Sequence, residues 1–151
     1  MKWYLAGPMS GIPQFNFPAF EEAAKVLRSR GMHIISPHEE DPPEMQAAAW
    51  ASPDGKLTAE ALAGHTWGET LARDVKLISD NVDGIVFLDR WWYSRGARLE
   101  AFVGLLTGKK FAKASYVTFR DFLKDVMVTR FSHIVDADDH YVRRTLEENM
   151  P

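Results

Sequence analysis

The chain has 151 residues, of which 46% are hydrophobic and 26% are charged. This length and composition predict one compact domain with a single sizeable core. The formal net charge of −3 gives no electrostatic reason to expect a nucleic-acid polymer or an anionic membrane as a partner, so a small polar ligand fits better. There are no cysteines, which excludes disulfides, zinc–thiolate sites and thiol nucleophiles.

The first predicted strand covers residues 3–6 and closes at Gly7-Pro8. This apolar run is far too short for a signal peptide or a membrane helix, so we expect a cytoplasmic protein. After a loop rich in Gly, Pro and Phe, Asn16 is predicted to cap a helix that ends at Gly31. A second short strand is expected over residues 33–35.

An excursion without a clear hydrophobic period follows over residues 37–67, with a short helix predicted at 44–50. Connections of this length are commonly functional, so we expect it to lie near a site. Residues 67–81 predict a stronger amphipathic helix, and Arg73 and Asp74 lie off its apolar stripe.

The continuous apolar run at residues 85–88 is typical of a central parallel strand. A helix is expected over 96–107 and a weaker strand over 111–117. An amphipathic segment is expected over 119–131, and a charged arm or tail over 136–151.

Alternating strands and helices predict an α/β fold, namely a single-domain flavodoxin- or Rossmann-like three-layer sandwich over residues 1–135. Its mainly parallel sheet is expected to have about four to five strands. Ligands bind at the carboxyl ends of such strands, so the loops after Ala6, Ser36 and Leu88 should converge on one edge.

The most informative stretch is the strand-to-helix junction that runs to Glu100. Ser94 and Gly96 at this junction can present backbone N–H groups to a phosphate or sugar oxygen. Glu100 then lies about one turn into the helix, on the ligand side. The pattern predicts a sugar-binding site that contains a carboxylate.

Three motifs in this order resemble the nucleoside 2-deoxyribosyltransferase-like superfamily, within it a small group often found in bacteriophage genomes and labelled as a domain of unknown function. They are Tyr4 to Gly11, Asn16 to Phe20, and the Ser-Arg-Gly-Ala-Arg-Leu-Glu run that ends at Glu100. The resemblance covers roughly residues 2–117 and makes a phage-encoded protein of the bacterial cytoplasm an expectation.

The resemblance implies a role for each motif. Glu100 matches the glutamate nucleophile of the superfamily, and Asp74 and Asp89 match acidic residues that contact the base or sugar. Ser94 and Gly96 match the part that holds the 5′-hydroxyl or 5′-phosphate. The substrate-binding residues expected on this basis are Tyr4, Gly7, Pro8, Met9, Ser10, Gly11, Phe15, Asn16, Trp91, Ser94, Arg95 and Gly96.

The chemistry of an N-glycosidic bond agrees with these roles. Its cleavage develops oxocarbenium character at the anomeric carbon, which a carboxylate stabilises or attacks. The base leaves more easily when protonated, so Asp89 or Asp74 is the candidate general acid. Arg95 and the nearby aromatic residues, Trp91 among them, favour a nucleotide over an unphosphorylated nucleoside.

Each assignment has a purely structural alternative. Glu100 can be a first-turn glutamate favoured by the helix dipole, and Asp74 a solvated helix residue. Asp89 can cap the turn after its strand, Trp91 can serve packing or a subunit contact, and Arg95 can form a weak surface ion pair.

Three functions remain open at this stage. The first is hydrolysis or deoxyribosyl transfer on a nucleoside 5′-monophosphate or nucleoside. The second is a binding protein that sequesters a nucleotide or a nucleotide-derived signal, and the third is cleavage of a NAD-like dinucleotide. We expect no metal, because the histidines lack metal-site spacing, and no cofactor, because the loop from Gly7 to Gly11 is neither a Walker loop nor a dinucleotide-binding Gly-x-Gly-x-x-Gly motif. A homo-oligomer is expected, because related folds complete their sites with a neighbouring subunit.

Overall fold

The computed structural model describes residues 1–114 and contains one four-stranded sheet. The strands are β1 (Lys2–Ala6), β2 (His33–Ile35), β3 (Gly84–Phe87) and β4 (Lys110–Lys113). Their order is β2-β1-β3-β4, and every pairing is parallel. The predicted α/β class with a parallel sheet is therefore confirmed. The segments expected at 119–131 and 136–151 lie outside the described residues.

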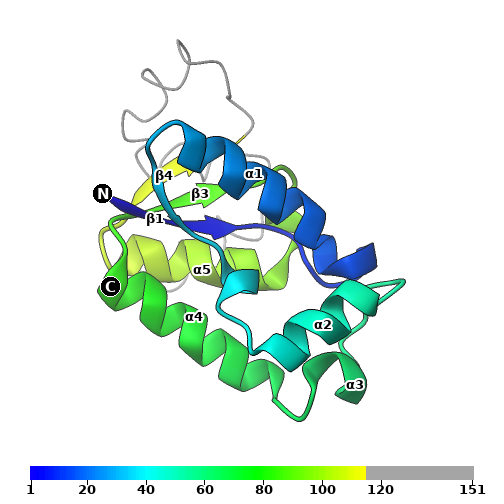
Figure 1. The fold of residues 1–151 in the computed structure, drawn as a ribbon. Coiled ribbons are helices and arrows are strands. Elements are labelled where there is room, and N and C mark those ends of the chain that lie inside the picture. The colour runs from blue at the N-terminus through cyan, green and yellow to red at the C-terminus, as the bar shows by residue number, and fades with distance from the viewer. Residues whose placement is uncertain (115–151) are drawn as a thin grey trace.

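Helices cover both faces of this sheet (Figure 1). One face packs on α1 (Phe17–Ser29), and the other packs on α4 (Trp67–Asn81) and α5 (Arg95–Leu106). Side chains alternate along a strand, so Trp3 and Leu5 of β1 join the α1 core, whereas Tyr4 and Ala6 face the α4–α5 core. The result is the expected three-layer sandwich.

The strand order creates a crevice beside the central strands. From β1 the chain crosses through α1 to β2 at one edge, and from β2 it returns past β1 to reach β3 on the other side. The loops after β1 and β3 therefore leave neighbouring strands in different directions. In parallel α/β sheets, ligands bind at such a switch point.

Local sequence fixes where the two helices nearest this crevice begin. Thr66 and Glu69 form a capping box at the start of α4, in which the Glu69 carboxylate accepts the Thr66 N–H at 2.7 Å. Ser94 caps α5 by accepting the N–H of Ala97 at 3.2 Å. Asn16 stands at the N-cap of α1, but its side chain makes no capping bond, because its amide donates instead to the carbonyl of Pro8 at 2.8 Å.

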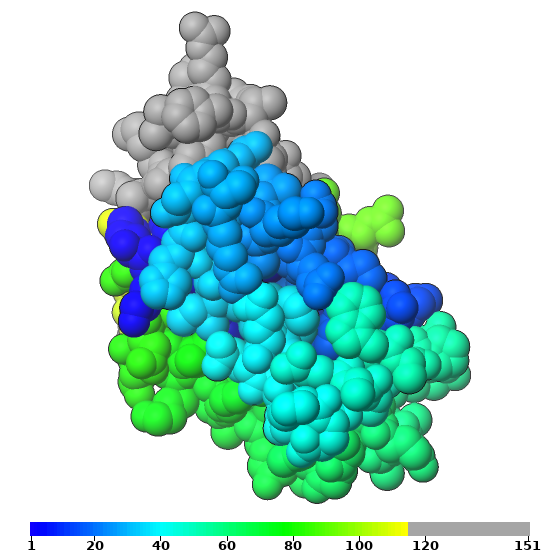
Figure 2. Space-filling model, viewed as in Figure 1, coloured from blue at the N-terminus to red at the C-terminus, as the bar shows by residue number. Residues whose placement is uncertain are grey.

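The excursion between β2 and α4 folds into a short 3-10 turn and two helices, α2 (Pro43–Ala51) and α3 (Ala59–Leu62). In Figure 2 its cyan and blue-green atoms form a continuous lobe next to α1. Two backbone bonds tie it to the loop after β1, from Gly11 N–H to the Gly55 carbonyl at 2.9 Å and from Gln14 N–H to the Ser52 carbonyl at 2.8 Å. A Cβ at Gly55 would lie 2.0 Å from the Ile12 oxygen, so this contact requires glycine.

Within residues 1–114, no helix has the length and apolar character needed to cross a membrane.

Candidate active site

A cavity of about 520 Å³ lies at the carboxyl edge of the sheet, where the loops after β1 and β3 meet the excursion. The expectation that these loops converge is therefore confirmed. The loop after β1 contributes residues from Gly7 to Phe15, and the β3–α5 junction contributes Arg90 and Tyr93 to Ala97. The excursion adds Asp41 and a mainly apolar wall that consists of Met45, Ala49, Leu57, Ala61 and Leu62.

Glu100 is the buried acid of this cavity. It lies on α5 with 7% of its surface exposed, and it lines the cavity wall. The hydroxyl of Tyr4, a fully buried residue of β1, donates a hydrogen bond of 2.8 Å to Glu100 Oε1. Glu100 is thus not an ordinary exposed first-turn glutamate, because its carboxylate is held in one position from the neighbouring strand.

The environment of Glu100 resists its ionisation. Burial, and after it the negative charge of Asp74, raises the pKa of the Glu100 carboxyl to about 8. The Tyr4 hydrogen bond and the Arg73 charge oppose this increase. A buried carboxyl with a raised pKa in a cavity is typical of functional sites.

Asp74 on α4 is the second acid of the cavity. Only 5% of its surface is exposed, and it lines the cavity. The structural alternative, a solvated residue on the polar side of the helix, is therefore wrong. Burial raises the pKa of Asp74 to about 6, although Arg73 acts in the opposite direction. The two carboxyls interact, so the pair titrates with two apparent pKa values and carries one proton between them around neutral pH.

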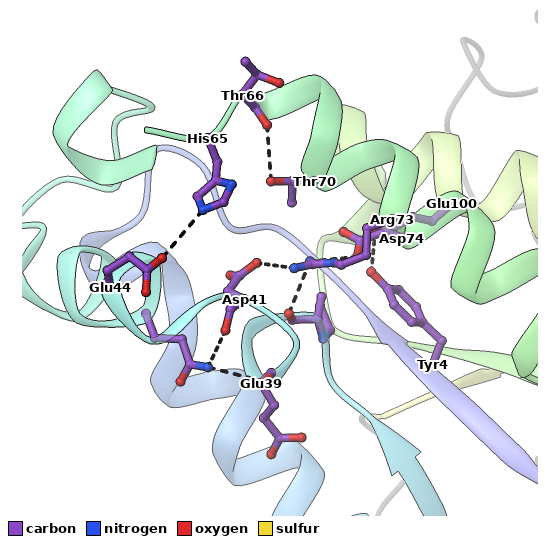
Figure 3. A network of polar contacts seen from close by, with 12 residues as sticks. Tyr4, Glu39, Asp41, Glu44, His65, Thr66, Thr70, Arg73, Asp74 and Glu100 are labelled. Atoms are coloured by element: carbon purple, nitrogen blue, oxygen red, sulfur yellow. Dashed lines mark hydrogen bonds and ion pairs between the residues drawn. The ribbon is translucent and has the colours of Figure 1, made fainter. Parts of the chain in front are cut away.

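Arg73 connects this acid pair to the excursion (Figure 3). Its guanidinium contacts Asp74 Oδ1 through Nε at 2.9 Å and Asp41 Oδ1 through Nη1 at 2.6 Å. Burial raises the pKa of Asp41, with the hydrogen bond from Arg73 opposing it. Three elements distant in the sequence, α4, β1 and the start of the excursion, therefore meet around one polar cluster.

The N-terminus of α5 forms another part of the wall. Ser94, Arg95 and Gly96 line the cavity, and the helix N-terminus presents unpaired N–H groups that favour an anion. The Arg95 guanidinium lies 5.9 Å from the ring centre of Trp67, which is partly exposed on the same cavity. This wall combines positive charge with aromatic surface.

Most of the residues expected at the site meet there. The cavity lining includes Gly7, Pro8, Met9, Ser10, Phe15, Asp74, Ser94, Arg95, Gly96 and Glu100. Tyr4 lies behind the lining and contacts Glu100. Asn16 also stays outside, where its bond to Pro8 supports the loop after β1.

Three further expected residues do not reach the cavity lining. Asp89 is exposed and lies beside α1 in a different surface pocket, with Leu88 and Ala114. Trp91 is 2% exposed and packs on Phe87 with ring centres 4.4 Å apart, so it serves core packing, which was the alternative to a role in ligand binding. Gly11 is exposed and turns the loop at φ 82°.

Sequence reasoning missed Arg73 and Asp41. No local pattern marks Asp41, which lies in a segment without periodicity, and Arg73 looks like any polar residue off an apolar stripe. Their contact spans 32 residues of sequence, so only the folded chain reveals it. Arg90 and Tyr93 also line the cavity and were missed, although they flank the motif that ends at Glu100.

Across the described residues, 1–114, no three His, Asp or Glu side chains are grouped so that they could hold a metal ion.

The fold and this cavity define a class of protein: a parallel α/β sandwich with a pair of buried carboxyls at the switch point of its sheet. The chain belongs to the family described as Domain of unknown function (DUF4406), which matches residues 1–113. No curated protein matches the chain.

Proposed function

We propose that this protein cleaves the N-glycosidic bond of a nucleoside 5′-monophosphate or nucleoside, with Glu100 as nucleophile. The observation that carries the proposal is the buried Glu100 carboxyl, which lines the cavity beside Asp74 and is fixed by the Tyr4 hydroxyl. A fixed carboxylate beside a second carboxyl of different pKa is the arrangement that glycoside cleavage requires. The resemblance of the three sequence motifs to the nucleoside 2-deoxyribosyltransferase-like superfamily supports the same chemistry.

In the first step, the Glu100 carboxylate attacks the anomeric carbon while the bond from that carbon to the base nitrogen breaks. The proton held by Asp74 passes to the departing base, which leaves neutral. The reactive form of the pair is therefore the one with an ionised Glu100 and a protonated Asp74. In the free protein the higher pKa of Glu100 favours the proton on Glu100, so the reactive form is the minor arrangement of the single proton, and the proton must move to Asp74 before Glu100 attacks. The Tyr4 hydrogen bond stabilises the ionised Glu100, since it is stronger to a charged acceptor.

In the second step, water or a second base attacks the same carbon and releases Glu100. The proton that this nucleophile loses returns to Asp74, so the protein ends in its starting state. Water gives hydrolysis, and a second base gives deoxyribosyl transfer. Asp74 is the acid in this scheme because it lines the cavity, whereas Asp89 does not.

The phosphate of a 5′-mononucleotide suits the start of α5. There, backbone N–H groups, the Arg95 guanidinium and the nearby Arg90 provide positive charge on the cavity wall. The apolar wall of the excursion suits the faces of a planar base. A volume of about 520 Å³ falls within the range of small-molecule sites.

The test measures, by chromatography, the release of free base from ribonucleosides, deoxyribonucleosides, their 5′-monophosphates and NAD. Wild type is compared with Glu100→Gln, with and without a second base. We expect release in the wild type and a loss of at least about 10³-fold in the variant, because the nucleophile is removed. Exchange that needs the second base makes the protein a transferase.

Two other outcomes identify the competing functions. Tight nucleotide binding without release from any substrate makes the protein a sequestering protein and refutes catalysis. Release of nicotinamide from NAD alone makes a dinucleotide the substrate. We also propose a homo-oligomer, since Tyr93, Leu99 and Leu106 of η3 (Trp91–Tyr93) and α5 are exposed apolar side chains, and light scattering of the purified chain measures its mass.

A further inference from the structure

We propose that Arg73 is a positioning residue that fixes Asp74 and locks the excursion over the cavity in one contact. This inference rests on the proposed function, in which Asp74 and Glu100 share the catalytic proton. Arg73 is not among the residues that line the cavity, so it acts through Asp74 and Asp41, which do line it.

The geometry of the contact is that of a two-sided clamp. Towards the sheet, Nε and Nη2 of Arg73 both lie on Asp74 Oδ1, at 2.9 Å and 2.8 Å. Towards the excursion, Nη1 donates to Asp41 Oδ1 at 2.6 Å, and Nη2 donates to the carbonyl of Pro37 at 3.4 Å. Figure 3 shows the guanidinium lying between the two carboxylates.

This cluster differs from a surface ion pair. The side chains of Arg73, Asp41 and Asp74 are 28%, 10% and 7% exposed, whereas Lys76 and Asp80, one turn further along α4, are 77% and 53% exposed. Exposed pairs contribute little, but a clamp with two largely buried carboxylates loses the compensation of both when its arginine is removed. Only a planar guanidinium supplies donors in both directions, so lysine does not replace it.

The charges around the clamp determine how it affects the catalytic proton. Arg73 faces Asp74 on its own helix and Asp41 on the excursion, while Glu100 of α5 and Tyr4 of β1 lie on the far side of Asp74. His38 and His65 act on Asp41. Arg73 is the cation that opposes protonation of both Asp74 and Glu100.

The clamp therefore links two properties of the site. Asp41 holds Arg73 in place only while the start of the excursion is seated, and the seated Arg73 orients Asp74 towards the cavity. The apolar wall that would contact a base belongs to the same excursion. Correct closure of the wall and correct placement of the catalytic acid thus depend on the same side chain.

The test compares Arg73→Gln and Arg73→Lys with the matched control Arg28→Gln. Arg28 also binds the excursion, through Glu39 at 2.7 Å, and it donates to the Ile34 carbonyl of β2 at 2.8 Å, but neither partner lines the cavity. For each variant, kcat and KM for the best substrate are measured from pH 5 to 9. The Asp and Glu carboxyl carbons are titrated by 13C NMR of the same labelled proteins.

For Arg73→Gln we expect kcat to fall at least tenfold, with a smaller change in KM, and the acidic limb of the pH profile to move to higher pH. Arg73→Lys keeps the charge and restores the position of that limb, but kcat stays low, because one ammonium does not hold both carboxylates. Arg28→Gln is expected to stay within twofold of wild type.

A folded Arg73→Gln protein with unchanged kcat and unchanged Asp74 titration overturns the proposal. Full recovery of kcat in Arg73→Lys also overturns it, because it would show that only the positive charge at this position matters and not the geometry of the guanidinium. If the wild type releases no base at all, the proposed function fails. The NMR titration then still decides whether Arg73 controls Asp74, so the two failures are distinguishable.

Discussion

The two faces of the sheet are built from the same strands but differ in what they bury. The face under α1 packs mainly apolar side chains, such as Leu5, Phe20 and Leu27, and within the described residues it buries no carboxyl. The face under α4 and α5 has an apolar core of its own, yet at the carboxyl edge it also buries Tyr4, Asp74 and Glu100.

This difference separates stability from chemistry. An apolar face stabilises the fold without conditions, whereas a buried carboxyl costs free energy unless it is protonated, hydrogen-bonded or paired. On the cavity face the Tyr4 hydroxyl and the Arg73 clamp offset part of this free-energy cost. The part that is not offset appears as the raised pKa values of Asp74 and Glu100. Substitutions on the two faces should therefore fail in different ways.

A large effect on the cavity face is expected for Asp74→Asn. Loss of a general acid costs on the order of 10²–10⁴-fold in kcat for a substrate with an ordinary base. A substrate whose purine is methylated at N7 already carries a positive charge and needs no proton to leave, so its cleavage should be affected far less. Equal losses on both substrates, measured as base release, would show that Asp74 is not the acid.

On the α1 face, Phe20→Ala is expected to lower the free energy of unfolding by about 3–5 kcal/mol, because a fully buried ring is replaced by a cavity. Urea denaturation measures this change, with the smaller truncation Phe20→Leu as its control. Since Phe20 does not line the active cavity, kcat of the folded fraction should stay within twofold. A large loss of kcat at full folding would contradict the separation of the two faces.

Glu100→Gln should stabilise the protein while it abolishes turnover, and the stabilisation should depend on pH. The pKa of Glu100 is raised from its ordinary 4.5 to about 8, so between these values the folded protein binds more protons than the unfolded chain, and wild-type stability falls as pH rises. Glutamine keeps the Tyr4 hydrogen bond without this dependence.

The difference in unfolding free energy between Glu100→Gln and wild type is therefore expected to grow from pH 4.5 and level off above about pH 8, at a few kcal/mol in favour of the variant. Denaturation curves across this range measure it, with Glu22→Gln on the exposed side of α1 as control. A constant difference would mean that Glu100 titrates in the folded protein as it does in the unfolded chain.

The smallest effect is expected for Asp89→Asn. This residue resembles a catalytic acid by its place after a central strand, but it lies exposed on the α1 side. We expect kcat and KM to change by less than twofold, and stability by less than about 0.5 kcal/mol, as for most surface substitutions. A tenfold loss of kcat would place Asp89 in the site and make the comparison of the two faces incomplete.

Sequence patterns predicted the elements well where one local rule dominates. The helix over Trp67–Asn81 and the strand over His33–Ile35 have their predicted bounds, because apolar period, capping residues and Gly or Pro breaks all act within a few residues. The short helix expected over 44–50 extends to Pro43–Ala51. The motif that ends at Glu100 likewise predicted one wall of the cavity, because its residues are close together in the sequence.

Patterns failed where the answer depends on what packs across the chain. Trp91 looked like a ligand platform, but it fills the core beside Phe87. Asp74 and Asp89 were both candidates for the general acid in the sequence, and the folded chain places Asp74 inside the cavity and Asp89 outside it. An acid near a strand end carries no local mark of the face on which it will lie.

The sequence by itself determined the order of the main helices and strands, the parallel sheet and the edge of the sheet at which the cavity lies, because these follow from hydrophobic period and from the connections between neighbouring elements. Only the tertiary structure decided which carboxyls share the cavity and which arginine holds them. The Arg73–Asp41 contact joins residues 32 positions apart, and the Tyr4–Glu100 bond joins residues 96 apart. Such pairings, and the burial that shifts the pKa of each acid, arise only when the layers pack together.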